Sequence, residues 1–388
     1  MVKKKLAIIF GTRPEAIKLA PLIKFCQQYP EIVKVRVIVT GQHREMLDQV
    51  LELFQIKPDW DMNVMKHDQT LSEVVAISLT KLEAIFADDR PDMVVVQGDT
   101  STAFVGALAA FYQQIPIAHI EAGLRTGDRF HPYPEEVNRR IISVLSNLHF
   151  VATKGAGNNL RKEGVPEKFI TMTGNTVIDA LGLVLGQPRN LPSSLASILE
   201  KDDTRRILVT VHRRENHGKP LQEICSAINK LLQITTNLEV IFLVHPNPQV
   251  QSIVRRRLKS QPRVHLYPPL NYWSFIQTMT RVDLVLTDSG GIQEEAPSLG
   301  VPVLVLREKT ERPEAVEVGA VKVIGTKTED IVSEVSQLLV KRQGLAAIRY
   351  QGNPFGDGRA CQRIFWVIAR YLGVKKQNYL EKEIVTPR

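Results

Sequence analysis

Short apolar runs rich in β-branched residues alternate along the chain with longer stretches that have the periodicity of amphipathic helices. This alternation is the pattern of βαβ units, in which a helix connects each strand to the next parallel strand. Ten runs are expected to be strands: Leu6–Phe10, Val35–Thr40, Met93–Gln97, Ile117–Ile120, Phe150–Thr153, Ile207–Val211, Val240–Val244, Val264–Tyr267, Leu284–Thr287 and Val301–Leu306. The sequence therefore predicts an α/β fold built on parallel sheets.

The length of the chain favours two domains. A chain of 388 residues is long for one hydrophobic core, because single cores stop growing at roughly 250–300 residues. Residues 186–194 (GQPRNLPSS) are rich in residues that interrupt regular structure. We expect this stretch to link two α/β halves.

The charge balance bears on possible partners. The composition is that of an ordinary globular protein, with 44% hydrophobic and 23% charged residues, but the net charge is +9. Such a charge suits nucleic acid, an anionic surface or a small anion. The densest basic stretch, residues 255–259 (RRRLK), lacks the aromatic residues of a single-strand binder and is expected to be a solvated helix face. A small anion is therefore favoured over nucleic acid.

Three further features bear on the compartment. The chain has no apolar run of the length that a membrane span needs, and Leu6–Phe10 is too short for the core of a signal peptide. The cysteines Cys26, Cys225 and Cys361 lack the spacing of a disulfide framework or of a zinc site. We expect a cytoplasmic protein that contacts no membrane and binds no metal.

Polar or glycine residues follow most of the predicted strands. They are Gly11-Thr12-Arg13, Gly41-Gln42-His43, Gly98-Asp99, Glu121, His212-Arg213-Arg214, His245 and Asp288-Ser289-Gly290-Gly291. Parallel sheets bind ligands beyond the carboxyl ends of their strands. These groups are therefore where a binding site is expected.

The segment 287–300 (TDSGGIQEEAPSLG) is the most specific of these strand ends. Two glycines would let backbone N–H groups approach a phosphate, and a helix start presents unpaired donors with partial positive charge. A carboxylate one turn later, Glu294 or Glu295, could accept hydrogen bonds from a ribose diol. The alternative is that both glutamates only complement the helix dipole, and these residues alone do not separate the two interpretations.

Two strand ends in the first half have simple structural explanations. Thr12 and Glu15 match a capping box, which leaves Arg13 available for a phosphate or for solvent. Asp99 follows Gly98 and taken alone is better explained as an N-cap of the next helix than as a catalytic carboxylate.

Other candidates are harder to explain structurally. Glu121 follows the apolar stretch Ile115–Ile120, where a carboxylate needs a partner, and Arg125 could be that partner. Glu135 and Glu136 fit the first turn of a helix, where acids are common without any ligand. His212 precedes two arginines that would oppose its protonation, and it could transfer protons, bind an anion or be a core histidine.

Several common motifs are missing from the sequence. The chain has no GxGxxG after a strand, no P-loop, no H-E-x-x-H and no G-x-S-x-G. These absences argue against NAD, ATP-type phosphoryl transfer, a zinc protease site and a hydrolase nucleophile.

Taken together, the motifs resemble the bacterial non-hydrolysing UDP-N-acetylglucosamine 2-epimerases across nearly the whole chain. The matching stretches occur in the family's order, and their joint presence is highly specific: GTRPEAIKLAPL, GQHREMLDQVLELF, GDTSTAF, HIEAGLRTGD, PEEVNRR, TGNTVIDAL, VTVHRREN, TDSGGIQEEAPSLG, ERPEAVEVG and NPFGDGRAC.

The resemblance implies a fold of the glycosyltransferase-B type. Two Rossmann-like domains, residues 1–180 and 181–365, would have parallel sheets facing a central cleft, and a terminal helix and tail, residues 366–388, would return to the first domain. It also implies a homodimer, no cofactor, and UDP-N-acetylglucosamine and UDP-N-acetylmannosamine as the ligands.

The resemblance also assigns site residues by position. Ser289, Gly290 and Gly291 would hold the UDP phosphates, Glu295 the ribose and Phe275 the uracil region, and Arg13 and Lys18 would face the cleft. Leu270 is a glutamine in some members, which affects base recognition. The matches to the family's catalytic groups are Asp99, Glu121, Glu135 and His212.

The implied reaction is reversible C2 epimerisation. The C2 proton is not adjacent to a carbonyl, so anti elimination of UDP would give 2-acetamidoglucal, and UDP would add again after protonation from the opposite face. This path needs acid and base groups on both faces of the sugar and stabilisation of the departing diphosphate. The expected pathway role is in cell-envelope polysaccharide synthesis.

The sequence does not exclude three other functions, and it leaves one regulatory property undecided. The alternatives are an epimerase of a modified sugar such as a diacetamido uronic acid, a glycosyltransferase of the same fold, and a nucleotide-sugar sensor without activity. Gln42, His43 and His245 match stretches of an activator pocket in some family members. Glu45 and Asp68 differ from strongly activated members, so we do not expect strong activation.

Overall fold

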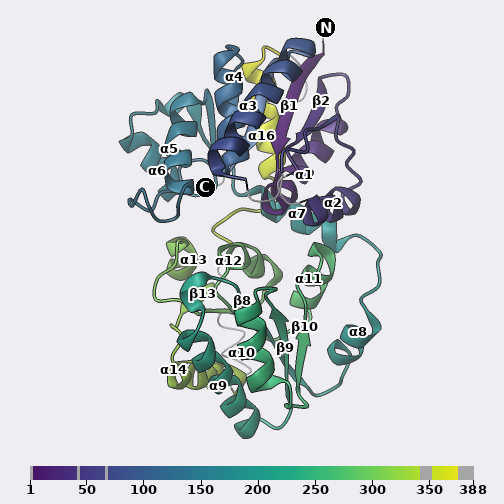
Figure 1. Cartoon of the computed structure of the whole chain (residues 1–388), viewed down its shortest axis with the longest axis vertical. Helices are drawn as coiled ribbons and strands as arrows, with labels where there is room; N and C mark the ends of the chain where they lie inside the picture. Colours follow the sequence, from purple (N-terminus) through teal and green to yellow (C-terminus); the bar gives the residue numbers. More distant parts are fainter. Residues whose placement is uncertain (1–2, 42–43, 66–68, 341–351, 375–388) are drawn as a thin grey trace. The chain divides into compact units, whose positions relative to one another are not determined.

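The structure is a computed structural model of the chain that describes residues 3–41, 44–65, 69–340 and 352–374 (Figure 1). Its contacts divide the chain into two compact units. Unit 1 comprises residues 1–183 and 355–388, and unit 2 comprises residues 184–354. Each unit is described separately below.

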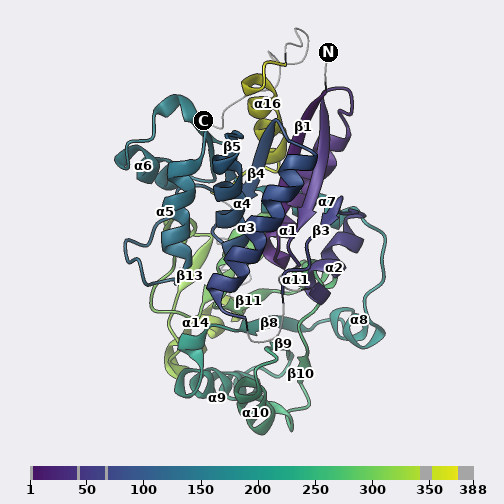
Figure 2. The same ribbon diagram turned by 45° about the horizontal axis from the view of Figure 1, so that its top comes forward.

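Unit 1 is a seven-stranded sheet with the strand order β3-β2-β1-β4-β5-β6-β7, and every pair of neighbours is parallel. Its strands are β1 Lys4–Phe10, β2 Val33–Val39, β3 Trp60–Asp61, β4 Met93–Gln97, β5 Ile117–Ile120, β6 Leu148–Val151 and β7 Ile170–Met172. Its helices are α1 Arg13–Gln27, α2 Arg44–Leu53, α3 Leu71–Asp88, α4 Ser101–Tyr112, α5 Glu135–Leu145, α6 Lys154–Lys162, the 3-10 helix η1 Glu167–Phe169, α7 Thr176–Leu185, which runs into unit 2, and α16 Ala360–Tyr371. Strands β1, β4 and β5 lie side by side in Figure 2.

Unit 2 is a six-stranded sheet with the order β10-β9-β8-β11-β12-β13, again wholly parallel. Its strands are β8 Arg205–Val211, β9 Leu238–Val244, β10 Val264–Tyr267, β11 Leu284–Thr287, β12 Val303–Val305 and β13 Val321–Val323. Its helices are α8 Ser193–Leu199, η2 Arg214–Asn216, α9 Lys219–Ile234, α10 Pro248–Leu258, α11 Tyr272–Met279, α12 Gly290–Glu295, η3 Ala296–Leu299, α13 Pro313–Glu317 and α14 Thr328–Val340.

The predicted α/β class with two parallel sheets is confirmed, and each of the ten predicted strands is present. The prediction missed β3, β7 and β13. These strands have two or three residues each and lie at sheet edges, where burial is weaker and the apolar signal is too short to separate from a loop.

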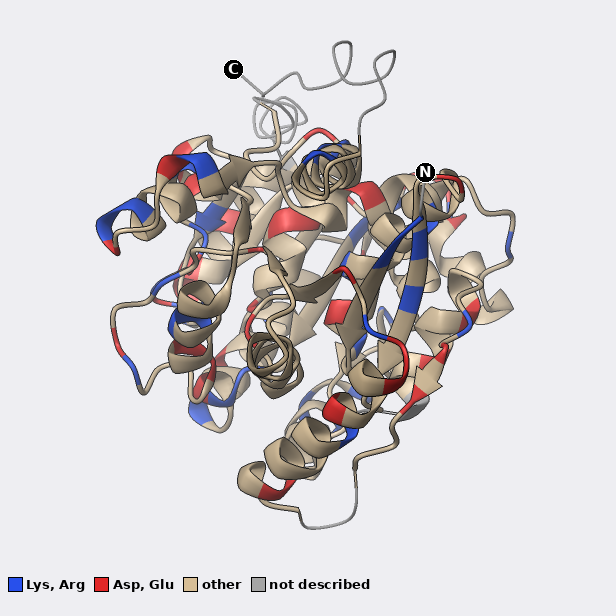
Figure 3. Cartoon of the chain, turned by 90° about the horizontal axis from the view of Figure 1, so that it is seen from above, with Lys and Arg blue, Asp and Glu red and all other residues tan. Residues whose placement is uncertain are grey.

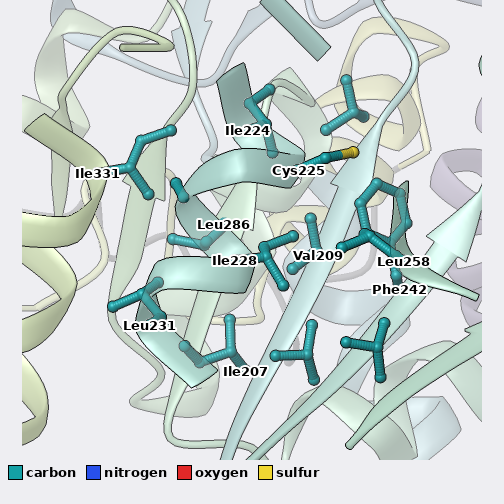
Figure 4. Close-up of a cluster of buried hydrophobic side chains, with 14 of the residues drawn as sticks. Ile207, Val209, Ile224, Cys225, Ile228, Leu231, Phe242, Leu258, Leu286 and Ile331 are labelled. Carbon is teal, nitrogen blue, oxygen red and sulfur yellow. The ribbon is translucent and has the colours of Figure 1, made fainter. Parts of the chain in front are cut away.

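The core of unit 2 shows why the alternating pattern folds in this way. Strand residues such as Val209 and Phe242 point toward Ile228 of α9, and all three side chains are almost fully buried (Figure 4). One face of α9 therefore covers the sheet, which buries the apolar stripe of the helix and the inward-facing strand residues together.

Helix α16 belongs to unit 1 although it lies near the end of the chain. The ring of Phe365 stacks on Tyr29, which follows α1, at a centroid distance of 4.9 Å and meets Phe25 of α1 at 5.4 Å. The carboxylate of Asp179 accepts hydrogen bonds from the N–H groups of Ala360 and Cys361, at 3.1 and 2.9 Å. Aromatic packing and a cap supplied by a distant residue thus hold this helix.

Each sheet has one topological switch point, where neighbouring strands have connections that leave in opposite directions. In unit 1 it lies between β1 and β4, and in unit 2 between β8 and β11. Open parallel sheets bind ligands at the carboxyl ends of the strands at this point. The predicted site residues next to it are Arg13 and Asp99 in unit 1 and His212 and Ser289 in unit 2.

Candidate active site

Glu121 is the centre of a buried polar cluster in unit 1. It follows β5 directly, is 9% exposed, and has a left-handed backbone with φ of +61°. Residues other than glycine rarely adopt this backbone conformation, because it costs of order 1 kcal/mol or more. Such strained residues are common at functional sites. The carboxylate lies next to Gln97 at the carboxyl end of β4 and to Lys18 of α1.

The side chains that donate hydrogen bonds to this carboxylate include three from distant parts of the chain. They are Lys18 of α1 (2.7 and 2.6 Å), Gln97 at the end of β4, and Asn175 (3.4 Å). The suggestion that Arg125 is the partner of Glu121 was wrong. Arg125 instead forms a bidentate ion pair with Glu163, in which both N–O distances are 2.7 Å.

Asp99 lies close to Glu121 and pairs with Arg139 of α5, whose Nε donates to it at 2.8 Å. Burial raises the pKa of Asp99, and the negative charge of Glu121 adds to the effect, while Arg139 and Lys18 oppose it. The N-cap interpretation of Asp99 was wrong, because Thr100 caps α4 and accepts from the N–H of Ala103 at 3.0 Å.

Helix α5 begins with two glutamates that have different environments. Glu136 is fully buried and accepts hydrogen bonds from the N–H of Thr126 at 3.0 Å and from Arg139 at 3.3 Å. Burial opposes its ionisation, but Thr126 and Arg139 outweigh burial and lower its pKa. Glu135 has a buried Oε2 with no hydrogen-bond partner among the described residues. Of these two glutamates, Glu135 is thus the one with a carboxylate oxygen that no described residue bonds.

The start of α1 is organised by Glu15, as the sequence predicts. Its carboxylate accepts from the N–H and hydroxyl of Thr12, both at 2.8 Å, and from the Thr100 hydroxyl at 2.6 Å. Burial raises its pKa and these donors partly reverse the effect. Arg13, the first residue of α1, is only half-buried.

At the switch point of unit 2, Asp288 joins the ends of three adjacent strands. This fully buried residue follows β11 and accepts from the N–H groups of His212 and Arg213, which follow β8. The side-chain amide of Asn216 donates both to Asp288 at 2.9 Å and to the carbonyl oxygen of Leu306, which follows β12, at 3.0 Å. The loop that carries His212 is therefore fixed to the sheet.

The glycine turn lies beside two arginines. A Cβ built on Gly290 would meet guanidinium nitrogens of Arg312 at 3.8 Å and of Arg213 at 4.0 Å. The Nε of Arg213 is buried and has no hydrogen-bond partner among the described residues. Two cations near a turn that starts a short helix make this end of β11 suitable for an anion.

The two glutamates of this segment are not in the first turn of a helix, as the sequence had suggested. Helix α12 begins at Gly290 and ends at Glu295, so both residues occupy its last turn, where the helix dipole does not favour an acid. Glu294 instead forms a buried ion pair with Arg312, and Glu295 accepts a hydrogen bond from the hydroxyl of Tyr272 at 2.8 Å. The dipole interpretation was therefore wrong.

The remaining predicted residues have simple placements. Phe275 is half-buried on α11. His245 is half-buried at the end of β9, and burial lowers its pKa, with His212 and His217 adding to the effect. Gln42 and His43 lie outside the described residues.

Two other observations concern ligands and surroundings. Over the ranges that the structure describes, no helix is both long and apolar enough to cross a membrane, and no group of three or more His, Cys, Asp or Glu side chains could hold a metal ion. Figure 3 shows basic and acidic residues interspersed along the ribbon.

Several residues that position the site carboxylates were not predicted from the sequence. Gln97 could have been found as the polar end of an otherwise apolar strand, and Asn175 follows a strand too short to recognise. Arg139 and Arg312 were not identifiable as partners of Asp99 and Glu294, because the members of each pair lie 40 and 18 residues apart in sequence.

Two wholly parallel α/β units, one with a carboxylate cluster and the other with an arginine-flanked glycine turn, are typical of enzymes that act on nucleotide-linked substrates. The family model described as UDP-N-acetylglucosamine 2-epimerase matches residues 26–369. The chain belongs to the UDP-N-acetylglucosamine 2-epimerase family.

Individual relatives agree with this assignment. The UDP-N-acetylglucosamine 2-epimerase of Bacillus subtilis is 45% identical over 97% of this chain and 98% of its own length. The crystal structure of UDP-GlcNAc 2-epimerase from Neisseria meningitidis bound to UDP-GlcNAc is 44% identical, with a TM-score of 0.86 over 94% of this chain and all of that chain. A glycosyltransferase of kitacinnamycin, 13% identical with a TM-score of 0.62 over 96% of this chain and 100% of its own, shares the fold.

Proposed function

We propose that this enzyme interconverts UDP-N-acetylglucosamine and UDP-N-acetylmannosamine by reversible epimerisation at C2. The observation that carries the proposal is the set of three carboxylates in unit 1: Asp99 and Glu121, which follow strands, and Glu135, which begins α5. Two of them are held by basic partners and one has an unbonded oxygen. Family membership supports the choice of substrate.

The proposed reaction is an anti elimination followed by re-addition. Breaking the C1–O bond to UDP builds positive character at C1, which acidifies the C2 proton. A base removes that proton and 2-acetamidoglucal forms. Protonation of C2 from the opposite face and return of UDP to C1 then give the epimer. All atoms of the substrate are retained except the hydrogen at C2, which exchanges with solvent.

The environments of the three carboxylates suit different parts of this reaction. Glu135 has an oxygen free of hydrogen bonds and is therefore suited to act as a base. Asp99 has a raised pKa, so its protonated form persists to higher pH and can donate. Glu121 keeps its position through Lys18 and Gln97. These three groups would supply the acid and base functions on the two faces of the sugar.

Unit 2 would hold the nucleotide. The turn Ser289–Gly291, with Arg213 and Arg312 beside it, would bind the diphosphate and stabilise its negative charge as it leaves. Glu295 would bind the ribose and Phe275 would lie near the base, while His212 would exchange a proton with the ligand or donate a hydrogen bond to it. Arg13 and Lys18 would add positive charge from unit 1.

We also propose a cytoplasmic homodimer that serves cell-envelope polysaccharide synthesis. Exposed apolar side chains on two neighbouring helices support an interface between subunits. Val144 of α5 is 84% exposed, and Phe111 and Tyr112 at the end of α4 are 54% and 64% exposed. Strong activation through a second pocket near His245 is not expected, since Glu45 and Asp68 differ from strongly activated members.

An NMR time course with UDP-N-acetylglucosamine as the sole addition tests this function. The account predicts a new anomeric signal from UDP-N-acetylmannosamine that reaches a constant ratio without any acceptor. Product formation only after an acceptor is added would identify a glycosyltransferase instead. Faster turnover of a diacetamido uronic acid donor would identify the modified-sugar epimerase, and binding without conversion would identify a sensor.

A further inference from the structure

The proposed function gives no role to the most buried carboxylate of the unit 2 site, Asp288. Its side chain is fully buried, whereas the ring of His212 beside it is 42% exposed. Oδ1 of Asp288 lies 2.8 Å from Nδ1 of His212. The imidazole thus has one nitrogen on a buried carboxylate while the rest of the ring reaches the surface of unit 2.

This contact determines which ring nitrogen carries the proton. Burial opposes ionisation of Asp288, but the His212 ring, the N–H of Arg213 and the Asn216 amide outweigh it and keep its pKa low. An ionised carboxylate only accepts hydrogen bonds, so Nδ1 must carry a hydrogen. In the neutral ring Nε2 is then the unprotonated nitrogen, and it is the one left to meet a ligand.

We propose that Asp288 is the positioning residue of His212: it holds the ring as the Nδ1–H tautomer, with Nε2 available to take a proton from the ligand or to return one. The inference rests on the proposed function for the role of His212. During the exchange the proton moves between the ligand and Nε2, while the Nδ1 proton stays in its hydrogen bond to Asp288. The carboxylate stabilises the imidazolium that forms and is not itself protonated.

Asp288 also organises the loop from His212 to Asn216 through backbone and amide hydrogen bonds. A purely structural role would therefore also make the residue important. The two roles differ in what they predict for the ring, because the structural role requires no particular tautomer. They also differ in whether the effect of a substitution depends on the presence of His212.

The test uses the full chain labelled with ¹⁵N in its histidines, with His212 assigned by comparison with the His212→Gln variant. Two-bond ¹H–¹⁵N spectra near neutral pH should show the Nδ1–H tautomer in the wild type. In Asp288→Asn the amide can donate to Nδ1, and His212 should shift toward the Nε2–H tautomer. His217 and His245 are close enough to this pair to interact with it, so both should be followed in the same spectra.

Kinetics provide the second readout. Asp288→Asn should lower kcat by about 10²- to 10⁴-fold with little change in KM, as when a triad histidine loses its carboxylate. His212→Ala should have a comparable effect, and the double variant should be no slower than His212→Ala. The matched control is Asp283→Asn. Asp283 precedes β11, accepts from the N–H of Arg206 at 2.8 Å and pairs with Arg205 at the opposite end of the strand, so this variant should keep kcat.

The outcomes separate this inference from the proposed function. An Nε2–H tautomer in the wild type, or losses that multiply in the double variant, would overturn the positioning role even if the enzyme epimerises its substrate. Conversely, a wild type that shows the predicted tautomer but no conversion of the nucleotide sugar would count against the proposed function alone. If Asp288→Asn unfolds, the wild-type tautomer still tests the positioning role: Nδ1–H agrees with it and Nε2–H overturns it.

Discussion

The switch points of the two sheets have the same topology but different chemistry. After β4 and the adjacent β5 lie the carboxylates of Asp99 and Glu121, which pair with Arg139 and Lys18; burial raises the pKa of Asp99, and the charge of Glu121 adds to this effect. At β8 and β11 one buried carboxylate holds a loop, and the groups near the turn are guanidiniums. The first arrangement suits proton transfer and the second suits anion binding. The fold thus supplies two equivalent positions, and the side chains make them different.

The largest expected effect comes from removing an acid/base group in unit 1. Asp99→Asn keeps the size of the side chain but removes the proton that Asp99 would donate, so kcat for epimerisation should fall by about 10²- to 10⁴-fold. UDP should bind with unchanged affinity, measured by calorimetry, because Asp99 is not among the groups proposed to bind the nucleotide. A large loss of UDP affinity with little loss of kcat would contradict this division of roles.

An intermediate effect is expected from the anion site in unit 2. Arg213→Lys keeps the charge but loses the planar guanidinium, and the loss of one charge-assisted hydrogen bond, about 1.5–3 kcal/mol, should weaken UDP binding by roughly 10- to 100-fold. The conversion rate at saturating substrate should change much less. Arg214→Lys is the matched control, because Arg214 is the next residue and is exposed. Equal losses of affinity in both variants would remove Arg213 from the diphosphate site.

The smallest effect concerns stability and the two glutamates of α5. Glu136 has a lowered pKa, so its contribution to stability is present above the ordinary glutamate pKa of 4.5 and is lost as pH falls through its own lower value. Glu136→Gln should therefore lower the free energy of unfolding at pH 7 by about 2 kcal/mol, and the difference from the wild type should shrink as the pH falls below 4.5.

Glu135→Gln is the natural control in urea unfolding measured across pH. Oε2 of Glu135 has no hydrogen-bond partner among the described residues, so this variant should unfold at nearly the wild-type urea concentration while epimerisation is impaired. A stability loss at Glu135 equal to that at Glu136 would show that the two environments do not differ as described.

The sequence was sufficient to predict the elements whose formation depends on a local pattern of apolar and polar residues. Both end residues of Met93–Gln97 were predicted correctly. A fully buried strand appears in the sequence as a mostly apolar run that is bounded by turn residues. The edge strand Trp60–Asp61 was missed because two residues cannot show a period. The positions of site residues at strand ends followed from the same pattern.

Pairing between distant residues was not predictable in this way. Arg125 was the nearest cation to Glu121 in sequence, but the partner is Lys18, 103 residues away, because only the folded sheet brings Lys18 of α1 next to the residue that follows β5. The N-cap of α4 is Thr100, not Asp99 as the sequence had predicted, for a related reason. Arg139 draws Asp99 into an ion pair, and the next residue is left to accept the N–H of Ala103. Because Thr100 rather than Asp99 caps α4, the carboxylate of Asp99 is not used as a helix cap.

The central claim is that the C2 hydrogen leaves and is replaced from solvent while the diphosphate departs and returns. Incubation of the enzyme with UDP-N-acetylglucosamine in D₂O, followed by NMR and mass spectrometry of the epimers, measures this most directly. The account predicts one deuterium at C2 of the UDP-N-acetylmannosamine formed and none elsewhere. An epimer that retains its original C2 hydrogen would contradict the elimination route.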